Sequence, residues 1–222
     1  SPTGLDINSS NGAINPSLSN IGTYTIEYNN GLCSSTSATL TIDKIVPTIF
    51  SEIVTKTYGD PEFSISAISS STGTFSFQVM DTSVASNTGT NSITITGVGT
   101  TTIKINQTAD ANYSTASKTI LLYVAKADPN IFISNIVTRT FGDPDFDLTA
   151  TSSSTGIFSY VAIDSTIASI SSNSVSIAGA GTTTIIVNQA SDVFYNAASS
   201  SLTLIVYKAD PIIYFPDVTK IF

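Results

Sequence analysis

The sequence predicts an all-β protein built from tandem antiparallel β-sandwiches. Three observations support this prediction: a repeat of long period, short apolar stripes that alternate with polar residues, and a polar composition that carries little charge. Segment 57–63 (Thr-Tyr-Gly-Asp-Pro-Glu-Phe) returns as segment 140–146 (Thr-Phe-Gly-Asp-Pro-Asp-Phe), 83 residues later, and segment 97–103 returns as 179–185, 82 residues later. This period exceeds the roughly 20–50 residues of a solenoid unit. It matches the size of a small independent domain.

The repeat divides the 222-residue chain into four expected parts. Residues 44–125 and 126–207 are two complete copies, and we expect each to fold as one domain. Residues 1–43 have a different sequence, and we expect them to be the C-terminal part of a truncated domain. Residues 208–222 are expected to begin a further, truncated repeat, so the chain is interpreted as part of a longer array.

Short joints connect the expected domains. Segments 126–129 and 208–211 both read Lys-Ala-Asp-Pro, and segment 44–47 reads Lys-Ile-Val-Pro. None of the joints is rich in Gly and Ser, as a flexible linker would be, and the proline restricts the backbone. The match continues beyond the last joint, because segment 218–222 aligns with segment 54–58. We therefore predict an elongated, semi-rigid rod.

Apolar and polar residues alternate within each copy, which is the pattern of half-buried strands. In the first copy the apolar stripes are Phe63, Ile65 and Ala67; Phe75, Phe77 and Val79; Ile93 and Ile95; Ile103 and Ile105; Ile120, Leu122 and Val124. Each stripe has a counterpart 82 or 83 positions later. With a further segment around 131–132, each copy has six or seven short strands. We expect two sheets whose inward stripes form one core.

Residues 1–43 contain two tight-turn signals. Asn11-Gly12 and Asn30-Gly31 are the dipeptides that favour two-residue hairpin turns. Segments 22–28 and 37–42 would be the strands on either side of the second turn. About four strands in all are too few for a stable sandwich, so this part is expected to be incomplete or to lean on its neighbour.

Glycine and proline mark the turns of each copy. The Gly-Asp-Pro segments at 59–61 and 142–144 are expected to break the chain before a strand, because proline cannot donate to a sheet. The glycine pairs in 97–99 and 179–181 lie between strands, where a positive φ or a close backbone approach is expected. The aspartates of the Gly-Asp-Pro segments could instead bind calcium. The clustered, alternating carboxylates of a calcium loop are missing, however.

Charge excludes several classes of partner. Charged residues make up 11% of the chain, against roughly 25% in ordinary soluble proteins, and the net charge is -8. The eight Lys and Arg residues do not cluster, so we expect no binding to nucleic acid or to an anionic membrane surface. The apolar runs stay below the roughly 18 residues that a membrane-spanning helix needs. We therefore expect no membrane insertion of this segment.

The residue types that most enzymes use are missing. The chain has no histidine and one cysteine, which excludes Ser-His and Cys-His nucleophiles and the common zinc sites. We expect no catalytic residue, no cofactor and no metal. Cys33 has two interpretations: a half-buried thiol at a strand end, or one partner of a disulfide to a residue outside this segment.

Three loop aromatics and one serine are the candidate site residues. Tyr113 and the pair Phe194 and Tyr195 lie in equivalent loops before the last strand of each copy. A loop aromatic either closes the open end of a sandwich or stacks on a sugar ring, so these residues are a candidate ligand-contact loop. Ser165 is a candidate O-glycosylation site, because Asp164-Ser165-Thr166 resembles the short glycosylation motif of Bacteroidetes.

The second half of each copy resembles a known family. Segments 84–103 and 167–185, with Gly-Val-Gly-Thr-Thr-Thr-Ile and Gly-Ala-Gly-Thr-Thr-Thr-Ile at their ends, resemble bacterial immunoglobulin-like domains. The aromatic-Gly-Asp-Pro segments resemble a subtype that occurs in tandem in giant surface proteins of Bacteroidetes. Residues 1–43 resemble a different immunoglobulin-like module. Mixed arrays of this kind look like the adhesins of gliding flavobacteria.

This resemblance implies an extracellular protein of the bacterial cell surface, secreted by the type IX system, that supports adhesion and gliding motility. Its expected partners are neighbouring repeats of the same chain and a surface polysaccharide or substratum, with secretion and motility machinery acting elsewhere on the protein. The family implies no active site on these repeats. The first hypothesis is therefore a structural stalk or filament segment of an adhesin. The alternatives are a module that binds glycan or protein through its loops, and a spacer in a secreted multidomain enzyme.

Overall fold

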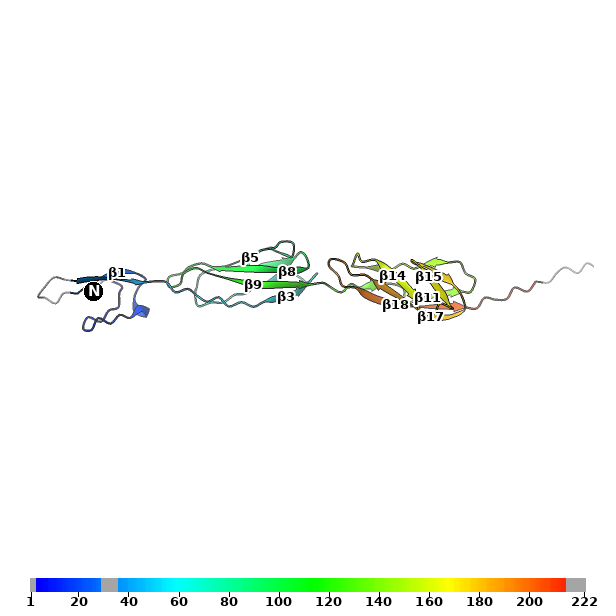
Figure 1. Cartoon of the computed structure of the whole chain (residues 1–222), viewed down its shortest axis with the longest axis horizontal. Helices are drawn as coiled ribbons and strands as arrows, with labels where there is room; N and C mark the ends of the chain where they lie inside the picture. The colour runs from blue at the N-terminus through cyan, green and yellow to red at the C-terminus, as the bar shows by residue number, and fades with distance from the viewer. Residues whose placement is uncertain (1–2, 29–35, 215–222) are drawn as a thin grey trace, which may run out of the picture. The chain divides into compact units, whose positions relative to one another are not determined.

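The structure, a computed structural model, describes residues 3–28 and 36–214. It divides into two compact units: Ser1–Lys56 with Pro61–Tyr123, and Thr57–Asp60 with Val124–Phe222. Figure 1 labels several of the strands of both units. Strands dominate both units. Within the described residues, the one helical element is a 3-10 turn, Pro16–Leu18, which Asn15 caps by accepting a hydrogen bond from the Ser17 N–H. The predicted all-β class is confirmed.

The second repeat contains nine strands. Their bounds are β10 (Ile131–Phe132), β11 (Ile136–Thr140), β12 (Phe146–Asp147), β13 (Thr151–Ser152), β14 (Phe158–Ala162), β15 (Ala168–Ser171), β16 (Ser174–Ile177), β17 (Gly181–Gln189) and β18 (Ala198–Tyr207). The larger sheet has the order β11-β18-β17-β14 and the smaller one β12-β16-β15, and β10 pairs with β13. This is the immunoglobulin arrangement, in which strands A, B, E and D face strands C, F and G.

One strand pair departs from the expected antiparallel pattern. β11 lies parallel to β18, with five residue partners from Ile136 opposite Thr203 to Thr140 opposite Tyr207. The remaining pairs of this repeat are antiparallel. Parallel pairing is possible because most of the repeat lies between β11 and β18 in the sequence, which provides the long connection that a parallel pair needs.

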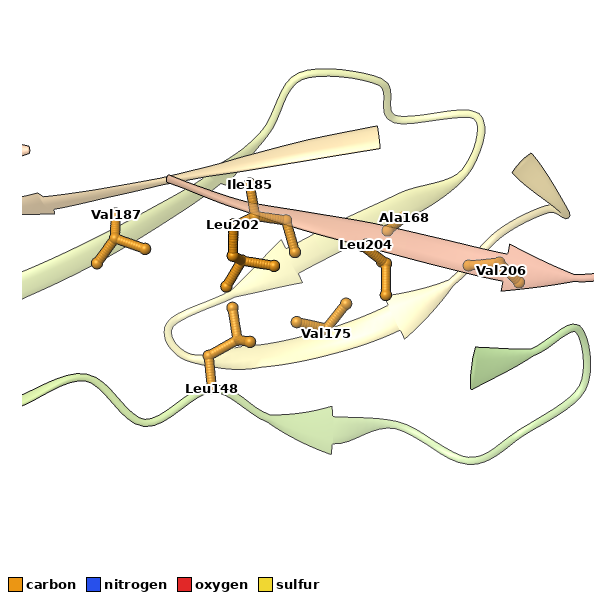
Figure 2. Packing of buried hydrophobic residues seen from close by; sticks show 8 residues of the cluster. All are labelled: Leu148, Ala168, Val175, Ile185, Val187, Leu202, Leu204 and Val206. Atoms are coloured by element: carbon orange, nitrogen blue, oxygen red, sulfur yellow. The ribbon is translucent and has the colours of Figure 1, made fainter. Parts of the chain in front are cut away.

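The core of the second repeat lies between its two sheets. Figure 2 shows eight buried side chains that point toward one another. β18 contributes Leu202, Leu204 and Val206; the others are Leu148, Ala168, Val175, Ile185 and Val187. All eight are at most 5% exposed. Along β17 and β18 these buried residues alternate with more exposed ones, which confirms the predicted inward stripes.

The first repeat has the same strand order. Its strands are β3 (Val54–Thr57), β4 (Phe63–Ser64), β5 (Phe75–Val79), β6 (Ala85–Asn87), β7 (Ser92–Ile95), β8 (Gly99–Gln107) and β9 (Ala116–Ala125), arranged as β3-β9-β8-β5 and β4-β7-β6. The counterpart of the β10–β13 pair is a single bridge between Phe50 and Ile68. The predicted stripe from Phe63 to Ala67 is shorter as a strand, because β4 pairs with β7 through only two residues.

The N-terminal part contains one two-stranded sheet. β1 (Gly22–Tyr28) and β2 (Thr36–Ile42) pair antiparallel over seven residue partners, as expected for a hairpin. The turn at 30–31 and Cys33 lie outside the described residues. The first expected hairpin is reduced to a bridge between Ile7 and Ile14, because Pro16–Leu18 leaves the strand path after Asn15.

Backbone approach explains two of the predicted glycines. A Cβ atom on Gly97 would lie 2.3 Å from the Ser83 carbonyl oxygen, and one on Gly179 would lie 2.6 Å from the Thr166 carbonyl oxygen. Both distances are shorter than atoms can tolerate. The predicted close approach is confirmed at these positions.

The Gly-Asp-Pro segments form turns. Asp60 accepts a hydrogen bond from the Thr57 N–H at 2.9 Å, and Asp143 accepts one from the Thr140 N–H at 2.8 Å. These carboxylates therefore close their own turns. Across residues 3–28 and 36–214, no group of three His, Cys, Asp or Glu side chains is placed to hold a metal ion.

Candidate functional site

The candidate loop aromatics lie beside an aspartate. In the second repeat, the loop between β17 and β18 holds Asp192, Phe194 and Tyr195. The Asp192 Oδ1 atom accepts hydrogen bonds from the N–H groups of Phe194 and Tyr195, both at 2.8 Å. The Asp192 N–H in turn donates to the Tyr195 carbonyl oxygen at 3.1 Å. The aspartate thus folds the loop around its own carboxylate.

The second carboxylate oxygen ties this loop to another part of the repeat. Asp192 Oδ2 accepts hydrogen bonds from the Thr155 N–H at 2.7 Å, the Thr155 hydroxyl at 2.8 Å and the Ser154 hydroxyl at 3.0 Å. Ser154 and Thr155 belong to the segment between β13 and β14. One side chain therefore joins two loops that are 37 residues apart in sequence.

These hydrogen bonds change the acidity of the aspartate. Burial alone would raise the pKa of Asp192, but the hydrogen bonds from Thr155, Tyr195 and Phe194 outweigh it and hold the pKa well below its usual range. The carboxylate is charged at neutral pH, and both of its oxygens are occupied by donors.

A buried glutamine lies next to this aspartate. Gln189, at the end of β17, is 2% exposed. Its amide Nε2 donates to the carbonyl oxygens of Ser154 and Gly156 at 3.1 and 2.9 Å, and its Oε1 accepts from the Ser152 hydroxyl at 2.7 Å. The side chain satisfies backbone carbonyls of the β13–β14 segment inside the protein, where water cannot reach them.

The first repeat contains the same network. Asp110 accepts from the Thr72 N–H at 2.7 Å and from the Tyr113 N–H at 2.8 Å. Gln107 donates to the carbonyl oxygens of Ser71 and Gly73. Burial opposes the shift again, and hydrogen bonds hold the pKa of Asp110 well below its usual range. Tyr113 thus has a backbone position equivalent to that of Tyr195.

The lysine at the start of each joint hydrogen-bonds to the equivalent loop of the repeat that follows. Lys126 donates from Nζ to the Asp192 carbonyl oxygen, and Lys44 donates in the same way to the Asp110 carbonyl oxygen. The backbone follows: the Ala127 N–H donates to the Phe194 carbonyl oxygen at 3.0 Å, and the Asn196 N–H donates to the Ala127 carbonyl oxygen at 2.8 Å. The joint is thereby held to the loop before the last strand of the repeat that follows it. We call this loop, which contains Asp192 in the second repeat and Asp110 in the first, the Asp-centred loop. We call this set of residues (for the second repeat, Lys126, Ser154, Thr155, Gln189 and Asp192) the joint network.

The aromatic side chains of the loop stack on a third ring. Within the second compact unit, the Tyr58 ring is stacked on Phe194 with centroids 4.5 Å apart and an interplanar angle of 14°. Tyr58 also meets Tyr195 edge to face, with centroids 5.8 Å apart. Such aromatic pairs each contribute roughly 0.5–1.5 kcal/mol beyond the area they bury.

The predicted glycosylation residue lies apart from this network. Ser165 is exposed in the turn between β14 and β15. Its neighbour Asp164 accepts hydrogen bonds from the Thr166 N–H at 2.9 Å and the Thr166 hydroxyl at 2.6 Å. Asp164 therefore shapes the turn, and Ser165 remains a proposed modification site.

The sequence reasoning missed the aspartates, glutamines and serines of the joint network. A signal for them was present: segments 69–73 and 152–156 are both Ser-Ser-Ser-Thr-Gly, and Asn-Gln followed by Asp three residues later occurs in both copies. Polar residues that recur at the same positions in both copies indicate a shared structural role, here in the joint network. Their pairing across 37 residues could not be read from periodicity alone.

The polar groups of the joint network hydrogen-bond to one another and to the backbone. Its carboxylates accept hydrogen bonds and stay charged, and the amides and hydroxyls around them are donors with partners. Over the part of the chain that the structure describes, no buried side-chain polar atom lacks a hydrogen-bond partner. A reaction needs groups that exchange protons or electrons with a substrate, whereas these groups are occupied with one another.

Comparison with family models finds no match, and no curated protein matches the sequence. Among solved structures, human protocadherin-24 EC1-2 matches with a TM-score of 0.34 and 12% identity over 76% of this chain and 100% of that one. Domains 1–6 of the surface layer protein SbsC match at 0.34 and 13%, over 92% of this chain and 37% of that one. The titin domains z1z2, in complex with telethonin, match at 0.36 and 18%, over 76% and 100%. We take no function from similarities of this size; the fold rests on the strand order.

Among the described residues, no helix reaches the length and apolar character that a bilayer span requires.

Proposed function

We propose that the chain is a structural repeat segment, a stalk or filament, of a large bacterial cell-surface adhesin. In this proposal the repeats lie outside the cell, connect to neighbouring repeats of the same chain, and carry load between the cell and a surface during attachment and gliding. Adhesive contact with a polysaccharide or substratum, and export by the type IX system, involve other parts of the protein.

One observation carries the proposal: what recurs between the copies is the joint network. Lys126, Asp192 and Gln189 of the second repeat have counterparts in Lys44, Asp110 and Gln107, with the same hydrogen-bond partners. A repeat selected for binding would preserve an exposed recognition surface. Here the repeated polar residues hold the joint to the domain, which is the property that a chain under tension needs.

The strand order also suits a load-bearing role. β11 is near the start of the second repeat and β18 at its end, and the two lie parallel. Tension on the two ends of the repeat pulls β11 and β18 in opposite directions along their length. Their interstrand hydrogen bonds are then loaded together in shear, whereas an antiparallel terminal pair would open one bond at a time.

Force spectroscopy on the chain, tethered through its two ends, tests the proposal. We expect one abrupt unfolding event for each of the two complete repeats. Each should lengthen the tether by less than about 270–300 Å, because an 82-residue repeat extends by at most about 3.3–3.6 Å per residue and the folded repeat already spans part of that length. Gradual lengthening at low force, without separate events, would contradict a load-bearing role.

The glycan-binding alternative has a separate test. A glycan array probed with the chain and with Tyr195→Ala would reveal binding through the loop as signal that the substitution removes. We expect no such signal, because the Tyr195 ring meets Tyr58 edge to face and the residue is only partly exposed. Binding that is lost in Tyr195→Ala would favour the alternative function.

A further inference from the structure

The position of Tyr58 recurs in the second repeat, where it holds an exposed aromatic ring. Tyr58 belongs by sequence to the Gly-Asp-Pro turn of the first repeat, and its ring stacks on Phe194 in the second compact unit. The equivalent residue of the second repeat is Phe141, 83 positions later. Phe141 is 47% exposed, whereas Tyr58 is only partly exposed. The same position thus carries a stacked ring in one copy and an exposed ring in the other.

The backbone around both rings is the same. The Tyr58 N–H donates to the Ala125 carbonyl oxygen at 2.9 Å, and the Phe141 N–H donates to the Tyr207 carbonyl oxygen at 2.8 Å. Asp60 and Asp143 close the following turn through equivalent hydrogen bonds. Phe141 is therefore held in the conformation that lets Tyr58 stack.

The surroundings of Phe141 leave room for a partner. A depression of about 310 Å³ is lined by Thr138, Arg139, Thr140, Asp143, Pro144 and Tyr207. Tyr207, the last residue of β18, is 57% exposed. Its lining combines the exposed Tyr207 ring with the Arg139 cation and the Asp143 carboxylate, and the exposed Phe141 follows Thr140 directly in the chain. Exposed aromatic surface of this kind is typical of the centre of a protein contact.

We propose that the surface formed by Phe141 and Tyr207 docks the Asp-centred loop of a following copy of the repeat in the same chain. Segment 208–211 repeats segment 126–129 residue for residue, so Tyr207 leads directly into the joint sequence of a next copy. The partner is an aromatic loop of the Phe194–Tyr195 type, and its rings stack on Phe141 as Phe194 stacks on Tyr58.

The docked loop turns a short joint into a defined contact. Lys126 and Ala127 hydrogen-bond to the loop of the second repeat, and the Tyr58 ring stacks on Phe194 of the same loop. The stacked ring adds a side-chain contact to a joint whose backbone the proline already restricts. This inference rests on the proposed function only in requiring that repeats follow one another in series.

Tryptophan fluorescence can test the docking, because the chain contains no tryptophan. Two chains are compared: residues 1–222, and an extended chain in which residues 1–207 are followed by a second copy of residues 126–214. Both chains carry Phe141→Trp, which in the extended chain is made only in the first copy of the repeat. Quenching of the tryptophan fluorescence by acrylamide is measured in each. We expect quenching to fall about threefold in the extended chain, with emission shifted to shorter wavelength.

Matched variants identify the cause of the change. Ile157→Trp, at a position that is 81% exposed, should be quenched equally in both chains. Tyr58→Trp should already be protected in residues 1–222, because Phe194 covers it. In the extended chain, Phe194→Ser and Tyr195→Ser in the added copy should restore quenching at position 141.

Three outcomes would overturn the proposal. The first is equal quenching of Phe141→Trp in the short and extended chains. The second is full quenching of Tyr58→Trp in residues 1–222. This measurement does not use the extended chain, so it tests the proposal even if the extended chain folds poorly. The third is protection in residues 1–222 that grows with protein concentration, since that would assign the surface to a second molecule. The force measurement is independent, because a repeat can resist tension whether or not its loop docks.

Discussion

At the scale of single residues, the polar groups of the joint network make more contacts with the rest of the repeat than the aromatic rings of the loop do. Asp192 accepts five hydrogen bonds, from Ser154, from Thr155 twice, and from Phe194 and Tyr195. Ionised acceptors form stronger hydrogen bonds than neutral ones. This one side chain therefore joins the β17–β18 loop to the segment between β13 and β14.

The acidity of this aspartate predicts a pH dependence. The pKa of Asp192 is lowered in the folded state, against about 3.9 in an unfolded chain. The carboxylate therefore raises the free energy of unfolding when the pH is above about 4, and this contribution is lost as the pH falls below that value. Urea unfolding of Asp192→Asn should show a lower midpoint than the parent at pH 7, and the difference should shrink on going to pH of about 2.

Asp147→Asn is the matched control for this experiment. Asp147 is an exposed aspartate in the smaller sheet of the same repeat. Its replacement removes the same charge and should leave the midpoint nearly unchanged at either pH. An equal effect of the two substitutions would assign the pH dependence to net charge and not to the network.

Gly73 supplies a second residue-scale prediction. A Cβ at this position would lie 1.9 Å from the Thr108 carbonyl oxygen, so Gly73→Ala must push two backbone segments apart. Overpacking typically costs about 1–3 kcal/mol, and we expect at least that loss in chemical denaturation. Gly89→Ala, where the nearest atom is 3.4 Å away, should change the free energy of unfolding by less than about 1 kcal/mol.

At the scale of strands, β18 is the centre of the second repeat. It pairs with β11 on one side and β17 on the other, and it contributes three residues to the core. Leu204→Ala should lower the free energy of unfolding by about 2–5 kcal/mol, because it leaves a cavity in a closed core. Ile157→Ala, which removes an exposed side chain, should have little effect. Similar losses in the two variants would mean that the inward face is wrongly assigned.

The β11–β18 pair supports an element-scale prediction about force. The Thr203 N–H donates to the Asn135 carbonyl oxygen, and the Phe141 N–H donates to the Tyr207 carbonyl oxygen. By alternation, Val137 directs its N–H toward β18, and Thr138 directs its own toward the open edge. Val137→Pro removes a loaded hydrogen bond and should lower the unfolding force of the second repeat markedly, whereas Thr138→Pro should lower it less.

At the scale of the whole molecule, the expected rod remains a prediction. Small-angle scattering of the chain should give a radius of gyration well above the roughly 17 Å that a compact globule of this length would have. The reason is that each repeat pairs its own strands and has its own inward stripes, and the short proline-containing joints restrict bending between repeats. A compact scattering profile would contradict the rod.

The sequence predicted the fold well because the information was local. Stripes such as Ile103 and Ile105 alternate with polar residues, and this alternation assigns each residue to the core or to water. A positive φ or a close backbone approach was expected at Gly97 and Gly179, and a backbone carbonyl does lie against each. Repetition at the period of a domain strengthened every such assignment.

Pairings between distant segments could not be predicted in the same way. Nothing in the local pattern indicates that β11 lies parallel to β18, that Asp192 reaches Thr155, or that Tyr58 meets Phe194. By itself, the sequence determined the repeat period of 82 to 83 residues, the all-β class, the inward stripes and the absence of histidine chemistry. Only the tertiary structure decided which polar residues hold the joint, because a hydrogen bond between loops depends on where the whole sandwich places their ends.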